Sequence, residues 1–326
     1  MEKNQRVVLG IESTAHTFGV GIVKDGKVLS NIRDSFTTET GGMIPYKVRE
    51  HHTKVCDQII KQALEKANLS IKNITLIAYS QGPGMGHALA IGAMTARTLS
   101  RFNKIPMIGV NHCIAHQTIG EKLSNVEDAI LLYASGANTQ IIAYEANKYR
   151  VFGETLDTGI GNFLDSFARE LGLGFPGGPK IAQLASKGKK LIPIPYKVKG
   201  MDVSFSGLFT HCKQLIGTCS NEDLCYSIQE TIFAMLVEVA ERAMAHTGKK
   251  DLILGGGVAC NTRLQEMCEI MCSERGAKSH VIPSEFYVDN GAMIAIQGFV
   301  QYKDQDDFKT RILPYQRTDD VKVDWK

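Results

Sequence analysis

The sequence lacks several features that would assign it to a class of protein at once. No apolar run approaches the roughly 20 residues that a membrane-spanning helix needs, so neither a span nor a membrane partner is expected. Residues 1–6 are polar and lead directly into a strand-like run, so no secretory signal is expected. Lys and Arg outnumber Asp and Glu only by 37 to 34, a balance that permits a nucleic-acid partner without arguing for one.

The eight cysteines form neither a disulfide framework nor a zinc motif. No two of them make a C-x-x-C pair, and Cys268 and Cys272 have the helical spacing of thiols on the core side of a helix. Unpaired thiols are typical of a reducing compartment. We therefore expect a cytoplasmic protein, present in the nucleus as well if the organism is a eukaryote.

The chain is long enough for two hydrophobic cores, with 326 residues of which 44% are hydrophobic. One pattern occurs twice: a buried strand, a small polar turn, a strand, a hairpin and a strand, first over residues 7–30 and again over 129–154. Strands that alternate with helices indicate the α/β class. The doubled pattern predicts two lobes with a cleft between them.

The remaining elements follow from hydrophobic periodicity. The stretch from 191 to 206 is expected to be irregular, and the polar tail from 303 to 326 is expected to lie on the surface. Helices are predicted over residues 46–67, 88–101, 161–171, 180–187, 225–246, 260–275 and 290–302, and further strands over 74–80, 105–110, 251–257 and 280–283.

Two histidines follow the strand at 105–110. If Asn111 caps a helix, His112 and His116 lie on one face of its first turns with Cβ atoms about 6 Å apart, so both rings can reach one metal ion. A zinc-protease helix has a glutamate after the first histidine as its base, and this chain has Cys113 there. The pair therefore offers ligands without a neighbouring base, and a capped, solvated helix start is the alternative.

Three glycine-rich turns follow predicted strands, at residues 82–86, 135–139 and 255–257. Turns of this kind let backbone N–H groups and a helix N-terminus approach a phosphate, although glycine also simply permits tight strand-to-helix connections. None has the P-loop spacing or the G-x-G-x-x-G pattern. Together, in a doubled chain, they predict a nucleotide between the two lobes.

Three further side chains are candidates for the cleft. Asp165 lies early in a predicted helix, where it either accepts from a ribose hydroxyl or stabilises the first turn. Asp289 precedes the last helix and either caps it or completes a His–His–Asp metal site. Tyr133 ends the first strand of the second lobe and is either a phenolic ligand or an ordinary strand aromatic.

Seven motifs, in order along the chain, resemble those of one family. Together they resemble the universal tRNA threonylcarbamoyladenosine transferase (TsaD/Kae) family, and Tyr133 with the VKGMD segment is similar to its archaeal and eukaryotic branch. The motifs are SQGPGMG (80–86), GVNHCIAH (109–116), LYASGANTQ (132–140), FPGGP (175–179), VKGMD (198–202), GGGVACN (255–261) and DNGAMIA (289–295).

The resemblance implies an actin/Hsp70-like (ASKHA) fold made of two duplicated ribonuclease-H-like lobes with an interlobe cleft. Residues 1–125 would form the N-terminal lobe with the histidine pair, and residues 126–326 the C-terminal lobe with the nucleotide-binding turns, its last helix packing back on the first lobe. It implies catalytic roles for His112, His116 and Asp289, and one metal ion bound by these three and Tyr133. The implied substrate- and nucleotide-binding residues are Tyr133, Ala134, Ser135, Gly136, Ala137, Asp165, Gly178 and Asn261.

Two positions depart from the family's pattern. Ala137 stands where the family usually has a second glycine, and Ala182 where it usually has an acidic residue, so one ribose or adenine contact is expected to be missing. The implied reaction moves a threonylcarbamoyl group from threonylcarbamoyl-AMP to N6 of adenosine 37 in tRNAs that read ANN codons, releasing AMP. One divalent ion, Fe²⁺ or Zn²⁺ foremost, suits a mixed nitrogen and oxygen donor set, with an ATP- or AMP-type nucleotide in the cleft.

The resemblance also implies partners: tRNA, and the KEOPS-type subunits, namely a small atypical kinase and a small dimerising subunit. The helices near 46–67 and 88–101 are candidates for that docking surface, and Arg49, His51 and His52 either line the tRNA entrance or form a solvated helix start. Two other classes of function stay open at this point. One is a metalloprotease, and the other is an ATP-binding scaffold subunit without catalysis.

Overall fold

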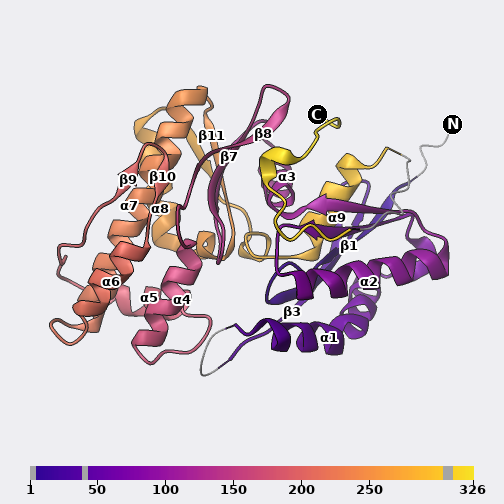
Figure 1. The fold of residues 1–326 in the computed structure, drawn as a ribbon. Helices are drawn as coiled ribbons and strands as arrows, with labels where there is room; N and C mark the ends of the chain where they lie inside the picture. The colour runs from indigo at the N-terminus through magenta and orange to yellow at the C-terminus, as the bar shows by residue number, and fades with distance from the viewer. Residues whose placement is uncertain (1–4, 39–42, 304–310) are drawn as a thin grey trace.

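The computed structural model describes residues 5–38, 43–303 and 311–326. The chain forms two five-stranded mixed sheets, one from each half of the sequence (Figure 1). Their strand orders are β3-β2-β1-β4-β5 and β8-β7-β6-β11-β12, with three antiparallel strands followed by two parallel ones in each. The two sheets thus share one topology, which confirms the predicted α/β class and the doubled unit.

The strands are those that the hydrophobic patterns predict, with small shifts at their ends. The first sheet contains β1 (Val7–Glu12), β2 (Thr17–Lys24), β3 (Lys27–Ser35), β4 (Leu76–Gly82) and β5 (Met107–Asn111). The second sheet contains β6 (Ile130–Ala134), β7 (Thr139–Glu145), β8 (Lys148–Glu154), β11 (Asp251–Gly255) and β12 (Lys278–His280), and a short hairpin is formed by β9 (Val198–Lys199) and β10 (Asp202–Val203).

Helices cover both faces of the sheets (Figure 1). Among the described residues, none of them is long and apolar enough to cross a membrane. They are α1 (Pro45–Lys66), α2 (Gly86–Asn103), α3 (His112–Ser124), α4 (Ile160–Glu170), α5 (Gly178–Ala185), α6 (Ser206–Gln214), α7 (Asn221–Thr247), α8 (Thr262–Glu274) and α9 (Gly291–Gln301).

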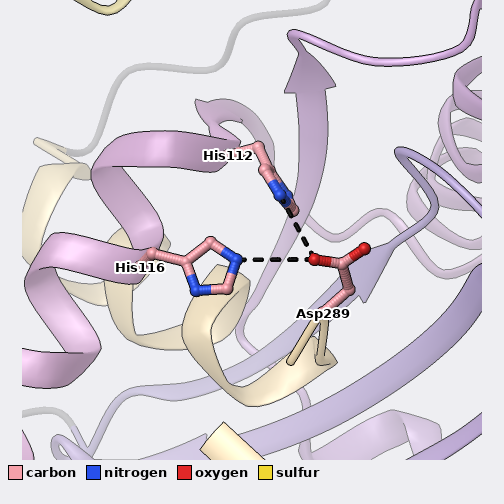
Figure 2. A group of neighbouring side chains, drawn as sticks. All are labelled: His112, His116 and Asp289. Carbon is pink, nitrogen blue, oxygen red and sulfur yellow. Dashed lines mark ion pairs between the residues drawn. The ribbon is translucent and has the colours of Figure 1, made fainter. Parts of the chain in front are cut away.

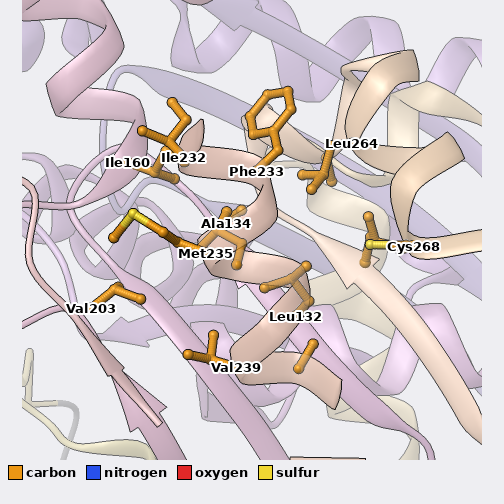
Figure 3. Close-up of a cluster of buried hydrophobic side chains, with 14 of the residues drawn as sticks. Leu132, Ala134, Ile160, Val203, Ile232, Phe233, Met235, Val239, Leu264 and Cys268 are labelled. Atoms are coloured by element: carbon orange, nitrogen blue, oxygen red, sulfur yellow. The ribbon is translucent and has the colours of Figure 1, made fainter. Parts of the chain in front are cut away.

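Each sheet has a hydrophobic core on both faces. Helices α1 and α2 pack on one face of the first sheet, and α3 and α9 on the other. In the second sheet, successive residues of β6 point to opposite faces: Leu132 and Ala134 face α7 and α8 (Figure 3), whereas Leu131 and Tyr133 face α3. Helix α3 therefore lies between the two sheets, where its first turn can contribute to a site shared by both.

Helix α9 packs very closely on the first sheet, although it follows the second sheet in sequence. A Cβ atom on Gly10 would lie 2.3 Å from the backbone nitrogen of Ala295, and one on Gly21 would lie 2.2 Å from that of Ala292. Real Cβ atoms do not approach backbone this closely, so these two positions require glycine. The chain thus returns from the second half to cover β1, β2 and β4.

Three elements differ from the predictions because tertiary contacts decide them. The β9–β10 hairpin forms within 191–206, a stretch that was expected to be irregular, and Asp202 accepts from the backbone of Glu154 there. Helix α6 was not predicted, since Gly207 and Thr210 weaken its helical pattern; it forms because Leu208 is buried and the Asp157 carboxylate accepts from the backbone of Ser206 at its start. The last strand lies at Lys278–His280 rather than 280–283, since its pairing with β11 fixes the register.

The described part of the C-terminal tail, 311–326, lies on the surface, but it also packs on the rest of the protein. Thr318 is buried, and Val321, Val323 and Trp325 alternate with polar residues and pack against the α3 face of the second sheet. The tail also contacts the first sheet, where the backbone of Leu313 donates to that of Gln81 in β4. The tail thus lies on the surface as expected, and its period-two apolar residues account for the packing that was not predicted.

Candidate metal and nucleotide site

Helix α3 presents the two histidines as predicted. Strand β5 ends at Asn111, whose Oδ1 accepts from the backbone nitrogens of Cys113 at 3.0 Å and Ile114 at 3.1 Å. This confirms Asn111 as the N-cap, and the helix that follows starts with His112. Because His112 and His116 are four residues apart, their rings lie on one face, 4.8 Å between centroids.

Asp289 completes the cluster from the other end of the chain. Its Oδ1 lies 3.4 Å from Nε2 of His112 and 3.5 Å from Nε2 of His116 (Figure 2). Asp289 does not cap α9, because Oδ1 of Asn290 takes that role by accepting from the backbone of Met293. The Asp289 carboxylate is therefore directed at the histidines, and the ligand atoms of the three residues all lie within 4.8 Å of one another.

The environment of the His116 ring fits a bound metal ion. This side chain is 1% exposed, yet neither of its ring nitrogens forms a hydrogen bond with any described residue. Buried polar atoms without partners are rare and destabilising, whereas a cation between His112, His116 and Asp289 would satisfy Nε2. Tyr133 Oη lies 2.9 Å from Nε2 of His112, so a phenolic oxygen is also at hand.

The charged groups of the cluster shift one another's pKa values. Burial disfavours the imidazolium form of His112, but the oxygens of Tyr133, Glu12 and Asp289 around the ring outweigh it and raise its pKa well above the usual value. Burial lowers the pKa of His116. Burial alone would raise the pKa of Asp289, but His112 holds it well below the usual value. The site is therefore arranged around a positive charge, which a divalent cation would supply.

Glu12 is a functional candidate that the sequence patterns did not reveal. It ends β1, is fully buried, and its Oε2 lies 2.9 Å from Nδ1 of His112. A carboxylate behind a ligating histidine fixes the ring's orientation and makes its free nitrogen a better ligand. The available signal was a charged residue at the end of an otherwise apolar strand, Val7–Glu12.

Replacing Glu12 by glutamine is expected to lower metal affinity 10- to 100-fold, the usual effect of losing such a partner. Metal titration against a competing chelator measures this effect. Ser13→Ala is a matched control, because the neighbouring Ser13 hydroxyl is buried and makes no hydrogen bond to a described residue. Equal affinities in the two variants would show that Glu12 does not support the metal site.

A cleft of about 1350 Å³ opens beside the cluster and is lined from both halves of the chain. His112, Tyr133 and Asp289 reach it, whereas His116 lies behind them. Among the other candidates, Ala134 is the exception: its side chain is fully buried in the core under α7, because it points to the opposite face of β6 from Tyr133. Lining the cleft are Ser135, Gly136, Ala137, Asp165, Gly178, Ala182 and Asn261.

The turn after β6 is packed directly against the start of α4. The backbone nitrogen of Gly161 donates to Ser135 at 3.0 Å, and a Cβ on Gly161 would lie 2.7 Å from Cα of Gly136. The backbone nitrogens of Ile160 and Asn162 donate to Thr139 and Gly136 as well, so the start of α4 holds this turn in place at the cleft. Burial raises the pKa of Asp165, whose Oδ1 accepts from the backbone of Gly177 at 2.7 Å.

Asn261 has a structural role as well as a place in the cleft. Its Oδ1 caps α8 by accepting from the backbone of Arg263 and Leu264, and its Nδ2 donates to Gln229 at 2.9 Å. Side chains from the tail and from β1–β2 also line the cleft, among them Tyr315 and His16. Sequence patterns could not show these, because the segments meet only in the folded chain.

Arg49, His51 and His52, near the start of α1, are exposed to different degrees. Arg49 is exposed, but His52 is fully buried, with Nε2 3.0 Å from the backbone oxygen of Ala15 and Nδ1 3.1 Å from Nδ1 of His51. His52 therefore does not line an entrance for tRNA. Burial, and then the neighbouring charge of His51, lower the pKa of His52 to about 4.

This burial predicts an acid-sensitive fold. Between pH 6.5 and about 4 the unfolded chain binds a proton at His52 that the folded chain does not, so stability falls as the pH drops through that window. At about pH 5 the loss is about 2 kcal/mol. Denaturant unfolding at about pH 7 and about pH 5 should show a smaller loss in His52→Gln, and an equal loss in both proteins would contradict the assignment.

The model of the family of tRNA N6-adenosine threonylcarbamoyltransferases (TsaD) matches residues 27–296. The chain belongs to this family. A tRNA N6-adenosine threonylcarbamoyltransferase of Thermococcus kodakarensis is 53% identical over 325 residues, 98% of this chain and 99% of that protein. One from Xenopus laevis is 45% identical over 335 residues, with 98% and 99% covered. These relatives confirm the resemblance, including its archaeal and eukaryotic character.

Longer proteins contain a similar chain as one part. A probable bifunctional tRNA threonylcarbamoyladenosine biosynthesis protein of Methanosarcina mazei is 49% identical over 324 residues, and this chain spans 59% of it. Solved structures support the fold. HypF of T. kodakarensis has a TM-score of 0.64 at 17% identity over 89% of this chain and 46% of HypF. Component A of an Acidaminococcus fermentans (R)-2-hydroxyglutaryl-CoA dehydratase has a TM-score of 0.58 at 16% identity, covering 90% and 96%. The predicted ASKHA fold is confirmed.

Proposed function

We propose that this chain transfers the threonylcarbamoyl group of threonylcarbamoyl-AMP to N6 of adenosine 37 in tRNAs that read ANN codons. Membership of the transferase family over nearly the whole chain supports the reaction. The observation that carries it is the cluster of His112, His116 and Asp289 at a cleft lined by the turns of both halves. Such a cleft can hold an acyl donor next to a cation and leave room for a base.

We propose that His112, His116, Asp289 and Tyr133 hold one divalent ion, Fe²⁺ or Zn²⁺. When bound, the ion supplies Lewis-acid chemistry to an oxygen of the acyl donor. Glu12 orients His112 through Nδ1. The burial of His116 and Tyr133, each 1% exposed, keeps bulk water from the inner side of the site. Exclusion of water protects a mixed anhydride against hydrolysis.

The nucleotide part of the donor is proposed to bind along the turn Ser135–Ala137. Backbone N–H groups of such a turn suit the phosphate of AMP, both in the donor and as it leaves. Asp165 would accept from a ribose hydroxyl, a role supported by its position in the lining of the cleft, and Gly178 and Asn261 line the same cleft. Ala182 also lines it, and its methyl group offers no hydrogen bond to the nucleotide.

The proposed lobes are residues 1–125 and 126–326, with α9 returning to the first. The proposed partners are tRNA and KEOPS-type subunits, a small atypical kinase and a small dimerising subunit, in the cytoplasm or nucleus. Helices α1 and α2 of the first lobe are the proposed docking surface, and α2 carries the exposed side chains of Met94 (66%) and Phe102 (86%).

Two rival functions remain to be compared. A metalloprotease would need a base beside the first histidine, and that position is Cys113, which is fully buried and has a raised pKa because of its burial. A catalytically idle ATP-binding scaffold would need no cation cluster. Protein cleavage that EDTA stops would favour the protease, and a chain that binds neither metal nor threonylcarbamoyl-AMP would favour the scaffold.

The deciding experiment is a transfer assay with metal-loaded chain, threonylcarbamoyl-AMP and a tRNA that reads an ANN codon. Modified adenosine is measured in the digested tRNA, with and without candidate partner subunits. We expect modification that depends on the cation and on adenosine 37. Absence of product under all of these conditions would contradict the proposed function.

A further inference from the structure

The nearly balanced charge of the chain conceals a strong local imbalance. Residues 171–201 contain six lysines and no acidic residue. The rest of the chain therefore has 31 basic and 34 acidic residues, a net charge of −3, against +6 for this segment. The lysine strip, as we name it, consists of Lys180, Lys187, Lys189, Lys190, Lys197 and Lys199, all of which are exposed.

The lysine strip begins at the rim of the cleft. Gly178, Pro179 and Ala182 of α5 line the cleft, and Lys180 lies among them on the same helix. Lys187 follows about 10 Å farther along the helix direction. The loop from there to β9 runs along the outer side of the second lobe (Figure 1) and covers at most about 40 Å up to Lys199.

Hydrogen bonds hold the backbone of the lysine strip in place. The backbone nitrogens of Lys189 and Lys190 donate to Oδ1 of Asp223 at 2.8 and 2.9 Å, and that of Ile192 donates to Oγ of Ser227 at 2.7 Å. Ile192 also packs on the core of the second lobe. The backbone is therefore bound to the start of α7, and the lysine side chains extend into solvent.

Three carboxylates near the lysine strip accept hydrogen bonds from groups other than its ammonium groups. Asp223 accepts from the two backbone amides, Asp202 accepts from the backbone of Glu154, and Glu238 is paired with Arg242. Within the described ranges, none of the six lysines forms an ion pair. A series of unpaired ammonium groups on a fixed backbone is suited to bind an extended polyanion.

We propose that the lysine strip binds phosphates of the tRNA substrate that flank the adenosine entering the cleft. This inference rests on the proposed function, since it takes the polyanion to be tRNA. RNA is favoured over a membrane or an acidic protein because one end of the strip forms the rim of the cleft that would receive the base. The exposed ring of Tyr196, fixed by its hydroxyl on Glu238, adds a surface on which a base can stack.

The test measures tRNA binding to the full chain at several salt concentrations. In the triple variant Lys187→Ala, Lys189→Ala, Lys190→Ala, each lost phosphate contact lowers the slope of log K against log salt by about 0.7 to 0.9. We expect a slope reduced by about 2, a KM for tRNA raised at least about 10-fold, and unchanged kcat and metal content. The matched control is Lys148→Ala, Lys250→Ala, Lys278→Ala, three exposed lysines at the starts of β8, β11 and β12 that do not line the cleft.

Equal slopes in the triple variant and its control would overturn the proposal. So would an unchanged slope for tRNA together with lost binding to anionic vesicles or to an acidic protein, because the strip would then serve another partner. If tRNA binding depends on the lysine strip but the chain transfers no threonylcarbamoyl group, only the proposed function is contradicted. The two failures are therefore distinguishable.

Discussion

Replacing His112 by alanine is expected to abolish metal binding and threonylcarbamoyl transfer together. His112 contributes Nε2 to the cluster with Asp289 at 3.4 Å, and it is the ring that Glu12 holds from behind. Loss of a partner behind a ligand already lowers metal affinity 10- to 100-fold, so loss of the ligand itself should exceed about 100-fold. Metal content after dialysis and modified adenosine in tRNA are the two measurements.

His280→Ala is the matched control, because this histidine is also largely buried and paired with a carboxylate, Asp251 at 2.7 Å, but lies outside the cleft. It should retain both metal and activity. Asp289→Asn provides a second variant of nearly the same shape that removes the carboxylate charge. Full transfer by a folded His112→Ala or Asp289→Asn protein without metal would exclude the proposed mechanism.

Replacing Gly178 by leucine is expected to block the nucleotide site and leave the metal site intact. A Cβ at Gly178 would meet only Cδ1 of Leu164 at 3.9 Å, so a side chain fits without disturbing the backbone and projects into the open cleft. Filling that space should weaken binding of threonylcarbamoyl-AMP by more than about 100-fold, since displaced phosphate or ribose groups lose several hydrogen bonds at about 1 kcal/mol or more each. Calorimetric titration with AMP and metal analysis measure the two effects separately.

A substitution four residues later is expected to have the opposite effect on nucleotide binding. Ala182→Glu introduces the acidic residue that the family resemblance implies at this position, and Ala182 lines the same cleft. We expect it to tighten AMP binding several-fold through one added hydrogen bond to a hydroxyl. If Gly178→Leu bound AMP as well as the parent chain, the nucleotide would have to lie elsewhere in the cleft.

Local patterns predicted those parts of the site that lie within one segment. The Asn111 cap and the spacing of His112 and His116 act over a single helical turn, so the sequence contained all that their placement needs. The alternation of strands and helices likewise predicted two equivalent sheets. The sequence left two alternatives open for Tyr133 and for Asp289, and only the family resemblance favoured the ligand role, because 156 residues separate the two positions.

The features that the sequence did not predict depend on contacts between distant segments. Glu12 acts through a ring 100 residues away. His52 is buried because it packs against Phe18 and the backbone of Ala15, not because of anything in its own helix. Tertiary contacts of this kind also override weak propensity, as α6 shows.

The position of α9 determines when the first sheet can complete its folding during synthesis. Strands β1 to β3 are synthesised first, but the face of the first sheet that bears Val8, Val23 and Ala78 is covered by a helix that ends at Gln301. At typical translation rates, about 15 to 60 s separate the two segments. Asp289 leaves the ribosome just before that helix. A nascent chain therefore cannot bring Asp289 to His112 and His116 until the helix that covers the first sheet is about to emerge as well. An apolar face exposed for that long is the stage at which a chaperone would matter most.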